Sequence, residues 1–131
     1  MHERQFLNAK SYALSALKGF NKVKDLYGES DANHILGLIH LQKNDFVQSR
    51  IYFDLSLKIE NMTKAPRPRI LADYQRHIGF IHLRLAEMKN ALPYFVHSFT
   101  IRREAGIEDA ALFAAQSLAS VLTNLGRTTE A

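Results

Sequence analysis

The sequence contains no cysteine, which excludes disulfide bonds, thiolate nucleophiles and thiolate metal ligands together. This absence is consistent with a reducing, cytoplasmic location. No run of 18 or more apolar residues occurs, so we expect no helix that crosses a membrane. Residues 1–5 lead into an amphipathic pattern rather than a continuous apolar stretch, so they are not expected to form a signal peptide.

Motifs that carry chemistry are also missing. The chain has no glycine-rich phosphate loop, no nucleophile elbow and no HExxH pair. Among its six histidines, His77 and His82 are five residues apart and so do not share one helix face. Asp45, Asp54 and Glu60 fall where turns or solvated helix faces are expected. We therefore expect neither an enzyme nor a bound metal or other cofactor.

The charge of the chain is moderate and slightly positive. Its 17 Lys and Arg residues exceed its 13 Asp and Glu residues, which gives a formal net charge of +4. This balance mildly favours an acidic partner, but it lacks the dense basic patch of a dedicated nucleic-acid binder. Hydrophobic residues make up 47% of the 131 positions, which is enough for a continuous core in one domain.

The chain does contain a repeat of its own pattern at an offset of about 40 residues. Small residues recur at offsets of 40, 42 and 40 positions, at Ala9, Ser49, Ala91 and Ala131. Other columns with these offsets are Tyr12, Tyr52 and Tyr94, and the dipeptides Leu36-Gly37, Ile78-Gly79 and Leu118-Ala119. Such offsets predict stacked supersecondary units, which usually form binding surfaces rather than catalytic pockets.

Apolar residues recur at three- and four-residue steps along almost the whole chain, which predicts helices. The expected helices cover residues 3–27, 30–43, 46–61, 69–86, 88–105 and 110–125. We expect Gly28 to end the first helix, Ser30 or Asp31 to cap the second, and Gly106 to end the fifth. Two prolines one residue apart mark residues 62–68 as a loop. No segment alternates with period two, so no strand is expected.

The paired helices resemble the tetratricopeptide repeat, in particular its longer subclass with a period near 40 residues. The resemblance rests on Asn33-x-x-Leu36-Gly37-x-x-His40 followed by Ser49-x-x-x-Phe53, and on Gln75-x-x-Ile78-Gly79-x-x-His82 followed by Ala91-x-x-x-Phe95. Gly37 and Gly79 would let paired helices approach closely. The family's opening aromatic residue and its final proline are absent, and histidine replaces its tyrosine. HEAT-type repeats have a similar period but lack the Leu-Gly column.

The resemblance implies an all-α fold in which antiparallel helix hairpins stack as a right-handed α-solenoid, with about six helices and a truncated seventh. A lone second-type helix would cover 3–27, repeats would cover 30–61 and 69–105, and an incomplete repeat would cover 110–131. Together they would form a single domain, 1–131, of a longer protein. The longer subclass is found in bacterial signalling regulators and in adaptors. The implied function is protein binding, as the sensory or scaffolding segment of a larger bacterial signalling or regulatory protein.

In this family the first helix of each pair lines a concave groove, and this implies the peptide-binding residues. They are His34, Leu38, Leu41 and Gln42 from the first pair, Asp73, Arg76, Phe80, Leu83 and Arg84 from the second, and Gln116, Ser120, Thr123 and Asn124 from the third. Arg76, Phe80 and Arg84 are four residues apart, so two guanidinium groups flank an aromatic ring and could hold carboxylates beside an apolar side chain. The alternative is a solvated helix face on which Asp73 pairs with Arg76.

Two further expectations concern packing. His40 and His82 occupy equivalent columns, so both are expected in a helix–helix seam as neutral side chains, which would make stability mildly acid-sensitive. The helix expected over 110–125 is apolar nearly all round, the pattern of a buried helix. Either the natural protein continues past Ala131, or this face self-associates. Homo-oligomerisation through this helix, as a homodimer, is therefore the alternative to groove binding, and neither a membrane nor nucleic acid is an expected partner.

Overall fold

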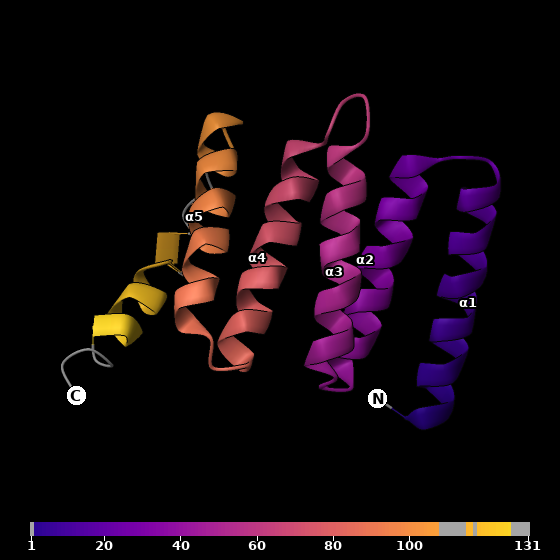
Figure 1. Cartoon of the computed structure of the whole chain (residues 1–131), viewed down its shortest axis with the longest axis horizontal. Helices are drawn as coiled ribbons and strands as arrows, with labels where there is room; N and C mark the ends of the chain where they lie inside the picture. The colour runs from indigo at the N-terminus through magenta and orange to yellow at the C-terminus, as the bar shows by residue number, and fades with distance from the viewer. Residues whose placement is uncertain (1, 108–114, 117, 127–131) are drawn as a thin grey trace. The chain divides into compact units, whose positions relative to one another are not determined.

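The computed structural model describes residues 2–107, 115–116 and 118–126, and every regular element among them is a helix (Figure 1). Five helices have defined bounds: α1 (Glu3–Lys22), α2 (Leu26–Gln42), α3 (Phe46–Asn61), α4 (Pro68–Arg84) and α5 (Met88–Glu104). Residues 115–116 and 118–126 are helical as well and fall within the helix expected over 110–125. None of the helices in these ranges has the length and hydropathy needed to cross a membrane. The all-α prediction is confirmed.

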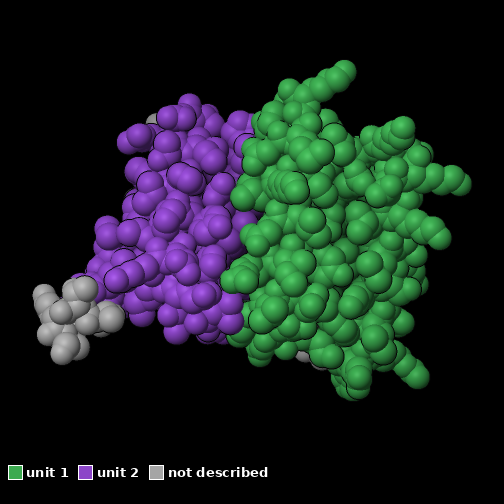
Figure 2. All heavy atoms as spheres, viewed as in Figure 1, with its two compact units in different colours: residues 1–66 green, residues 67–131 purple. Residues whose placement is uncertain are grey.

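The chain divides into two compact units, residues 1–66 and 67–131, which Figure 2 shows in different colours. In the first unit α2 packs against both α1 and α3, and in the second α4 packs against α5. The loop predicted over 62–68 lies between α3 and α4, and Pro68 occupies the first turn of α4, where its missing N–H is not needed. The stacking of the hairpins as a right-handed solenoid in one domain stays a prediction.

The boundary between the first two helices differs from the prediction. The first helix, expected to reach residue 27, ends at Lys22, and the second begins at Leu26 rather than near residue 30. Asp25 caps the second helix, because its Oδ1 accepts a hydrogen bond from the Gly28 backbone N–H at 3.1 Å. Gly28 therefore ends no helix. A Cβ at this position would lie 2.3 Å from Cδ1 of Phe20, so the glycine allows α1 and α2 to approach closely.

One type of turn ends four of the five helices that have defined bounds. A residue at positive φ follows α1, α2, α4 and α5, at Lys24 (58°), Asn44 (60°), Ala86 (61°) and Gly106 (73°). The next backbone N–H then donates to a carbonyl five residues back, from Asp25 to Phe20, Asp45 to His40, Glu87 to His82 and Ile107 to Arg102. These bonds form the Schellman motif, and the expectation that Gly106 ends the fifth helix is confirmed. Residues 25, 45 and 87 are also the N-caps of the following helices, which keeps these connections short.

Close packing within each hairpin depends on a glycine opposite a phenylalanine. A Cβ on Gly37 would lie 2.5 Å from Cδ1 and Cε1 of Phe53, and a Cβ on Gly79 would lie 2.9 Å from Cε2 of Phe95. Phe53 is 0% exposed and Phe95 is 3% exposed, so both rings are part of the core. The close approach predicted at these two glycines is confirmed.

Glu60 contradicts the expectation of a solvated position. Its side chain is 0% exposed, near the C-terminal end of α3. The hydroxyl of Ser30, also fully buried, donates a hydrogen bond to Glu60 Oε1 at 2.9 Å, as a buried polar group requires. Ser30 thus lies inside α2 and donates a hydrogen bond to the Glu60 carboxyl group rather than capping the helix. Asp45, by contrast, does lie at a turn, and Asp54 is exposed as expected.

Candidate functional site

A buried histidine lies at the centre of the first hairpin. His40 is 4% exposed, its ring is stacked on Tyr52 with centroids 5.4 Å apart, and its Nδ1 lies 3.3 Å from Asp45 Oδ2. The edge of a second ring, Phe6 of α1, meets it at 5.3 Å. Burial, reinforced by the positive charge of Lys10, lowers the pKa of His40 below 6.5, and Asp45 opposes this only in part. His40 is therefore neutral at pH 7, as expected of a side chain in a helix–helix seam.

The second hairpin repeats this arrangement with different residues. His82 is 8% exposed, stacked on Tyr94 at 5.3 Å, and hydrogen-bonded through Nδ1 to Glu87 Oε1 at 3.1 Å. The predicted equivalence of His40 and His82 is confirmed by this shared geometry. The acidic partners were not predicted, although an offset of 42 relates Asp45 to Glu87 as it relates the two histidines. Within the described ranges no three His, Asp or Glu side chains are placed to hold a metal ion.

The predicted groove residues of the first unit lie on α2 and are mostly half-buried. The His34 ring contacts the Phe53 ring, with centroids 5.5 Å apart. Leu38 and Leu41 are half-buried, whereas Gln42 is exposed. This part of the predicted groove therefore combines two half-buried leucines with a half-buried imidazole and an exposed amide.

The predicted groove residues of α4 form two local pairs. Arg76 Nη2 lies 4.0 Å from Oδ1 of Asp73, three residues earlier. The guanidinium carbon of Arg84 lies 5.6 Å from the centre of the Phe80 ring, which is 41% exposed. The structure thus brings Phe80 and Arg84 together as a cation–π pair, and the Asp73–Arg76 pair considered as an alternative is also present.

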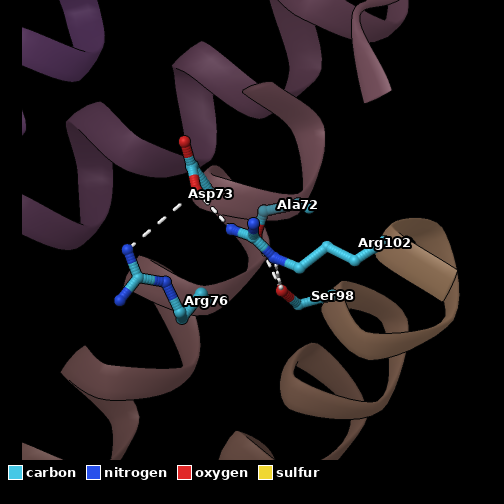
Figure 3. A network of polar contacts seen from close by, with 5 residues as sticks. All are labelled: Ala72, Asp73, Arg76, Ser98 and Arg102. Carbon is cyan, nitrogen blue, oxygen red and sulfur yellow. Dashed lines mark hydrogen bonds and ion pairs between the residues drawn. The ribbon is translucent and has the colours of Figure 1, made fainter. Parts of the chain in front are cut away.

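The side chain that holds Asp73 was not predicted. Arg102 of α5 is 5% exposed, and its guanidinium donates a hydrogen bond to Asp73 Oδ1 (Figure 3). Its Nε lies 3.5 Å from Ser98 Oγ, which donates in turn to the Ala72 carbonyl at 2.9 Å. Arg102 therefore holds Asp73 from the neighbouring helix, whereas Arg76, whose side chain is 30% exposed against 6% for Arg102, contacts Asp73 at 4.0 Å.

The remaining predicted residues lie toward the end of the chain. Leu83 packs against the buried cluster of Ala91, Phe95 and Val121, so it contributes to the core of the second unit. The residues predicted from the third pair are all exposed, namely Gln116, Ser120, Thr123 and Asn124. In the terminal helix Val121 is 1% exposed and Leu122 is 51% exposed. Residues 108–114, 117 and 127–131 of the predicted incomplete repeat lie outside the described residues.

Comparison with known proteins gives a likeness of fold. No protein-family model matches the chain, and no curated protein matches it significantly. Among solved structures, the crystal structure of BtubC (BKLC) from P. vanneervenii is similar, with a TM-score of 0.72 and 14% sequence identity. The match covers 92% of this chain and 50% of that chain, so this chain spans about half the length of BtubC. At this identity the likeness concerns the helical fold alone.

Proposed function

We propose that this chain is a protein-binding module of the tetratricopeptide type, in which the predicted groove residues of α2 and those of α4 each contact a peptide or a helix of another protein. The contacts shared by the two hairpins support this proposal. In both, a glycine faces a phenylalanine and a buried histidine stacks on a tyrosine. Equivalent contacts at equal offsets are typical of repeat proteins, because each unit buries the same faces. The fold likeness over 92% of the chain is consistent with this.

The single observation that carries the proposal is the exposed Phe80–Arg84 pair. Phe80 is 41% exposed, and Arg84 lies 5.6 Å from its ring centre. An aromatic ring beside a guanidinium group offers apolar contact and bidentate hydrogen bonding at one place, and such residues dominate many protein interfaces. We infer that the bound segment carries an apolar side chain next to carboxylates.

The ion pair between Arg102 of α5 and Asp73 of α4 strengthens this preference. Because Arg102 compensates the charge of Asp73, the 4.0 Å contact between Asp73 and Arg76 competes only weakly with an incoming carboxylate. Because these residues stand on a helix, their backbone is ordered before the partner arrives, which lowers the entropic cost of binding. In this proposal Leu38 and Leu41 add apolar contact. The resemblance further suggests a sensory or scaffolding role in a bacterial signalling or regulatory protein.

Quantitative capture of partners from the native lysate tests the proposal. Phe80→Ala and Arg84→Glu should each reduce the captured partner at least about tenfold, because hot-spot residues carry most of an interface's free energy. Val47→Ala and Lys58→Glu are matched controls, since Val47 is 57% exposed and Lys58 is exposed, both on α3. The controls should capture the same partners as the unmodified chain. If all four variants capture the same proteins in the same amounts, the groove does not bind them and the proposal is wrong.

A further inference from the structure

Helix α1 has the pattern of a second helix of a hairpin, but it exposes the face that a first helix would cover. Tyr12 stands in the column of Tyr52 and Tyr94. Those two tyrosines are half-buried and stacked on histidines of the preceding helix. Tyr12 is 79% exposed. The same side chain is therefore covered in two hairpins and uncovered in α1.

The exposed face of α1 that carries Tyr12 differs from the face that packs against α2. Phe6 and Ala13 are buried with Leu36 and Ile39 of α2, so one face of α1 is already packed. Ala16 is exposed, whereas the serines in its column on α3 and α5 are each 0% exposed. We call three residues of α1 the α1 strip: Tyr12 and Ala16, which are exposed, and Ala9, which is half-buried against the core of the first unit. The strip corresponds to the face of α3 and α5 that meets the first helix of the same hairpin.

We call the helical residues 118–126 the terminal segment. This segment has the pattern of a first helix, but it exposes the face that a second helix would cover. Leu122 stands in the column of His40 and His82. Those histidines are 4% and 8% exposed because a tyrosine of the next helix covers each of them, but Leu122 is 51% exposed. Ala119, in the column of the two glycines that face phenylalanine, is exposed as well. Val121 is 1% exposed and packs on α5, so the segment is docked on its other side.

We propose that the terminal segment of one copy covers the α1 strip of a second copy and so completes a hairpin between two molecules. Within the first unit the Ser49 hydroxyl donates to the Gly37 carbonyl at 2.7 Å, so these two columns are in contact in a hairpin. The same columns hold Ala9 in the strip and Ala119 in the segment, and two small side chains permit the same close approach.

The central contact of this interface joins Leu122 of one molecule to Tyr12 of the next. It takes the place of the stacked His40–Tyr52 and His82–Tyr94 pairs, with an aliphatic side chain in place of imidazole. Residues 118–126 include no charged residue, so they meet the lysine-bearing helix α1 without like-charge repulsion. The α1 strip requires a first-type helix with exposed small and apolar residues at this spacing. The terminal segment of a second copy has these residues, so we infer that a second copy covers the strip.

This contact joins two different faces, so each molecule in a pair keeps one face uncovered. Such heterologous contacts form rings when the rotation closes and open chains when it does not. The inference is independent of the proposed peptide groove, because it uses α1 and the terminal segment rather than the predicted groove residues of α2 and α4.

Two complementary variants test the proposal by light scattering across a range of protein concentrations. The unmodified chain should gain mass as its concentration rises. Tyr12→Asp and Leu122→Asp should each remain monomeric, with dissociation constants raised at least about thirtyfold, because a charge would be buried at the central contact. An equimolar mixture of the two should form a dimer and nothing larger, since one variant retains an intact terminal segment and the other an intact strip. Val47→Asp, at a side chain 57% exposed on α3, should assemble like the unmodified chain.

Several outcomes would overturn the proposal. The unmodified chain could remain a monomer at every concentration, which would mean that the strip is covered by something else or by nothing. The mixture could remain monomeric while the unmodified chain assembles, which would indicate a contact between identical faces. Circular dichroism should show unchanged helix content in each variant, because both substituted side chains are exposed. A variant that loses helix content is replaced by Tyr12→Ser or Leu122→Ser, and the same mixture outcomes then decide.

Discussion

The substitution Gly37→Ala should destabilise the first unit, although alanine is the better helix former. An added Cβ would lie 2.5 Å from Cδ1 and Cε1 of Phe53 and 3.1 Å from its Cγ. Because carbon atoms in contact are ordinarily about 3.5–4.0 Å apart, the ring or the helix would have to shift by about 1 Å. Phe53 is 0% exposed, so its ring has no solvent to move into.

The magnitude follows from two opposing effects. Overpacking a core costs about 1–3 kcal/mol, and the higher helix propensity of alanine offsets about 1 kcal/mol of that cost. We expect a net loss of about 1–2 kcal/mol for Gly37→Ala. The loss should be smaller for Gly79→Ala, whose nearest ring atom would lie 2.9 Å from the new Cβ. Gly19→Ala is the matched control, because a Cβ there meets nothing within 4 Å, and it should stabilise the protein by about 0.5–1 kcal/mol.

Urea unfolding followed by circular dichroism measures these free energies, and hydrogen exchange of the α2 and α3 amides localises the effect to the first unit. Adding Phe53→Leu to Gly37→Ala should recover part of the loss, because the smaller side chain relieves the overlap. A double-mutant cycle measures this coupling. If Gly37→Ala and Gly19→Ala change stability equally, the contact between glycine and ring does not limit the packing, and the reasoning is refuted.

Two other predictions concern pH and the helix ends. Burial lowers the pKa of His40 below 6.5, so the unfolded chain binds more protons than the folded one as the pH falls. The contribution of neutral His40 to the unfolding free energy is present above pH 6.5 and is lost on acidification through the lowered pKa. His40→Phe should remove this part of the pH dependence of the unfolding free energy, measured with urea. An unchanged pH dependence would contradict the assignment of this effect to His40. Ala86 has φ 61° and Gly106 has φ 73°, so Ala86→Gly should raise the unfolding free energy by about 1 kcal/mol and Gly106→Ala should lower it by about 1–2 kcal/mol. Ala105→Gly is the control at φ −82°, and the interpretation fails if it stabilises as much as Ala86→Gly.

The helices were predictable from sequence because their apolar residues recur with one period throughout. The turn between α1 and α2 was not predictable, because a glycine that ends a helix and a glycine that allows close packing inside a helix cannot be told apart in the sequence. Glycine often ends a helix, but Gly28 lies inside one and gives room to Phe20. The turn itself uses Lys24 at φ 58° and Asp25 as the cap, and lysine is not a residue that marks a positive φ.

The candidate site was predictable only where its contacts are local. Phe80 and Arg84 are one helical turn apart, so their pairing follows from helix geometry. Arg102 lies 29 residues from Asp73, and no periodicity relates two residues at that distance. The repeat could not reveal this contact either, because the positions equivalent to Arg102 in the other units hold different side chains.

That column shows how one repeated position can give the two units different surfaces. The column contains Phe20, Glu60 and Arg102; Phe20 is half-buried, and the last two are 0% and 5% exposed although both are ionisable residues. In the first unit the buried side chain is a carboxyl group that accepts a hydrogen bond from a hydroxyl, whereas in the second it is a guanidinium group that compensates the charge of Asp73. If the proposed groove is correct, the preference for carboxylates therefore belongs to the second unit and depends on Arg102, which never reaches the surface. Replacing Arg102 with a neutral side chain would leave Asp73 to compete for Arg76, so a variant with both groove arginines intact should still bind an acidic segment less tightly.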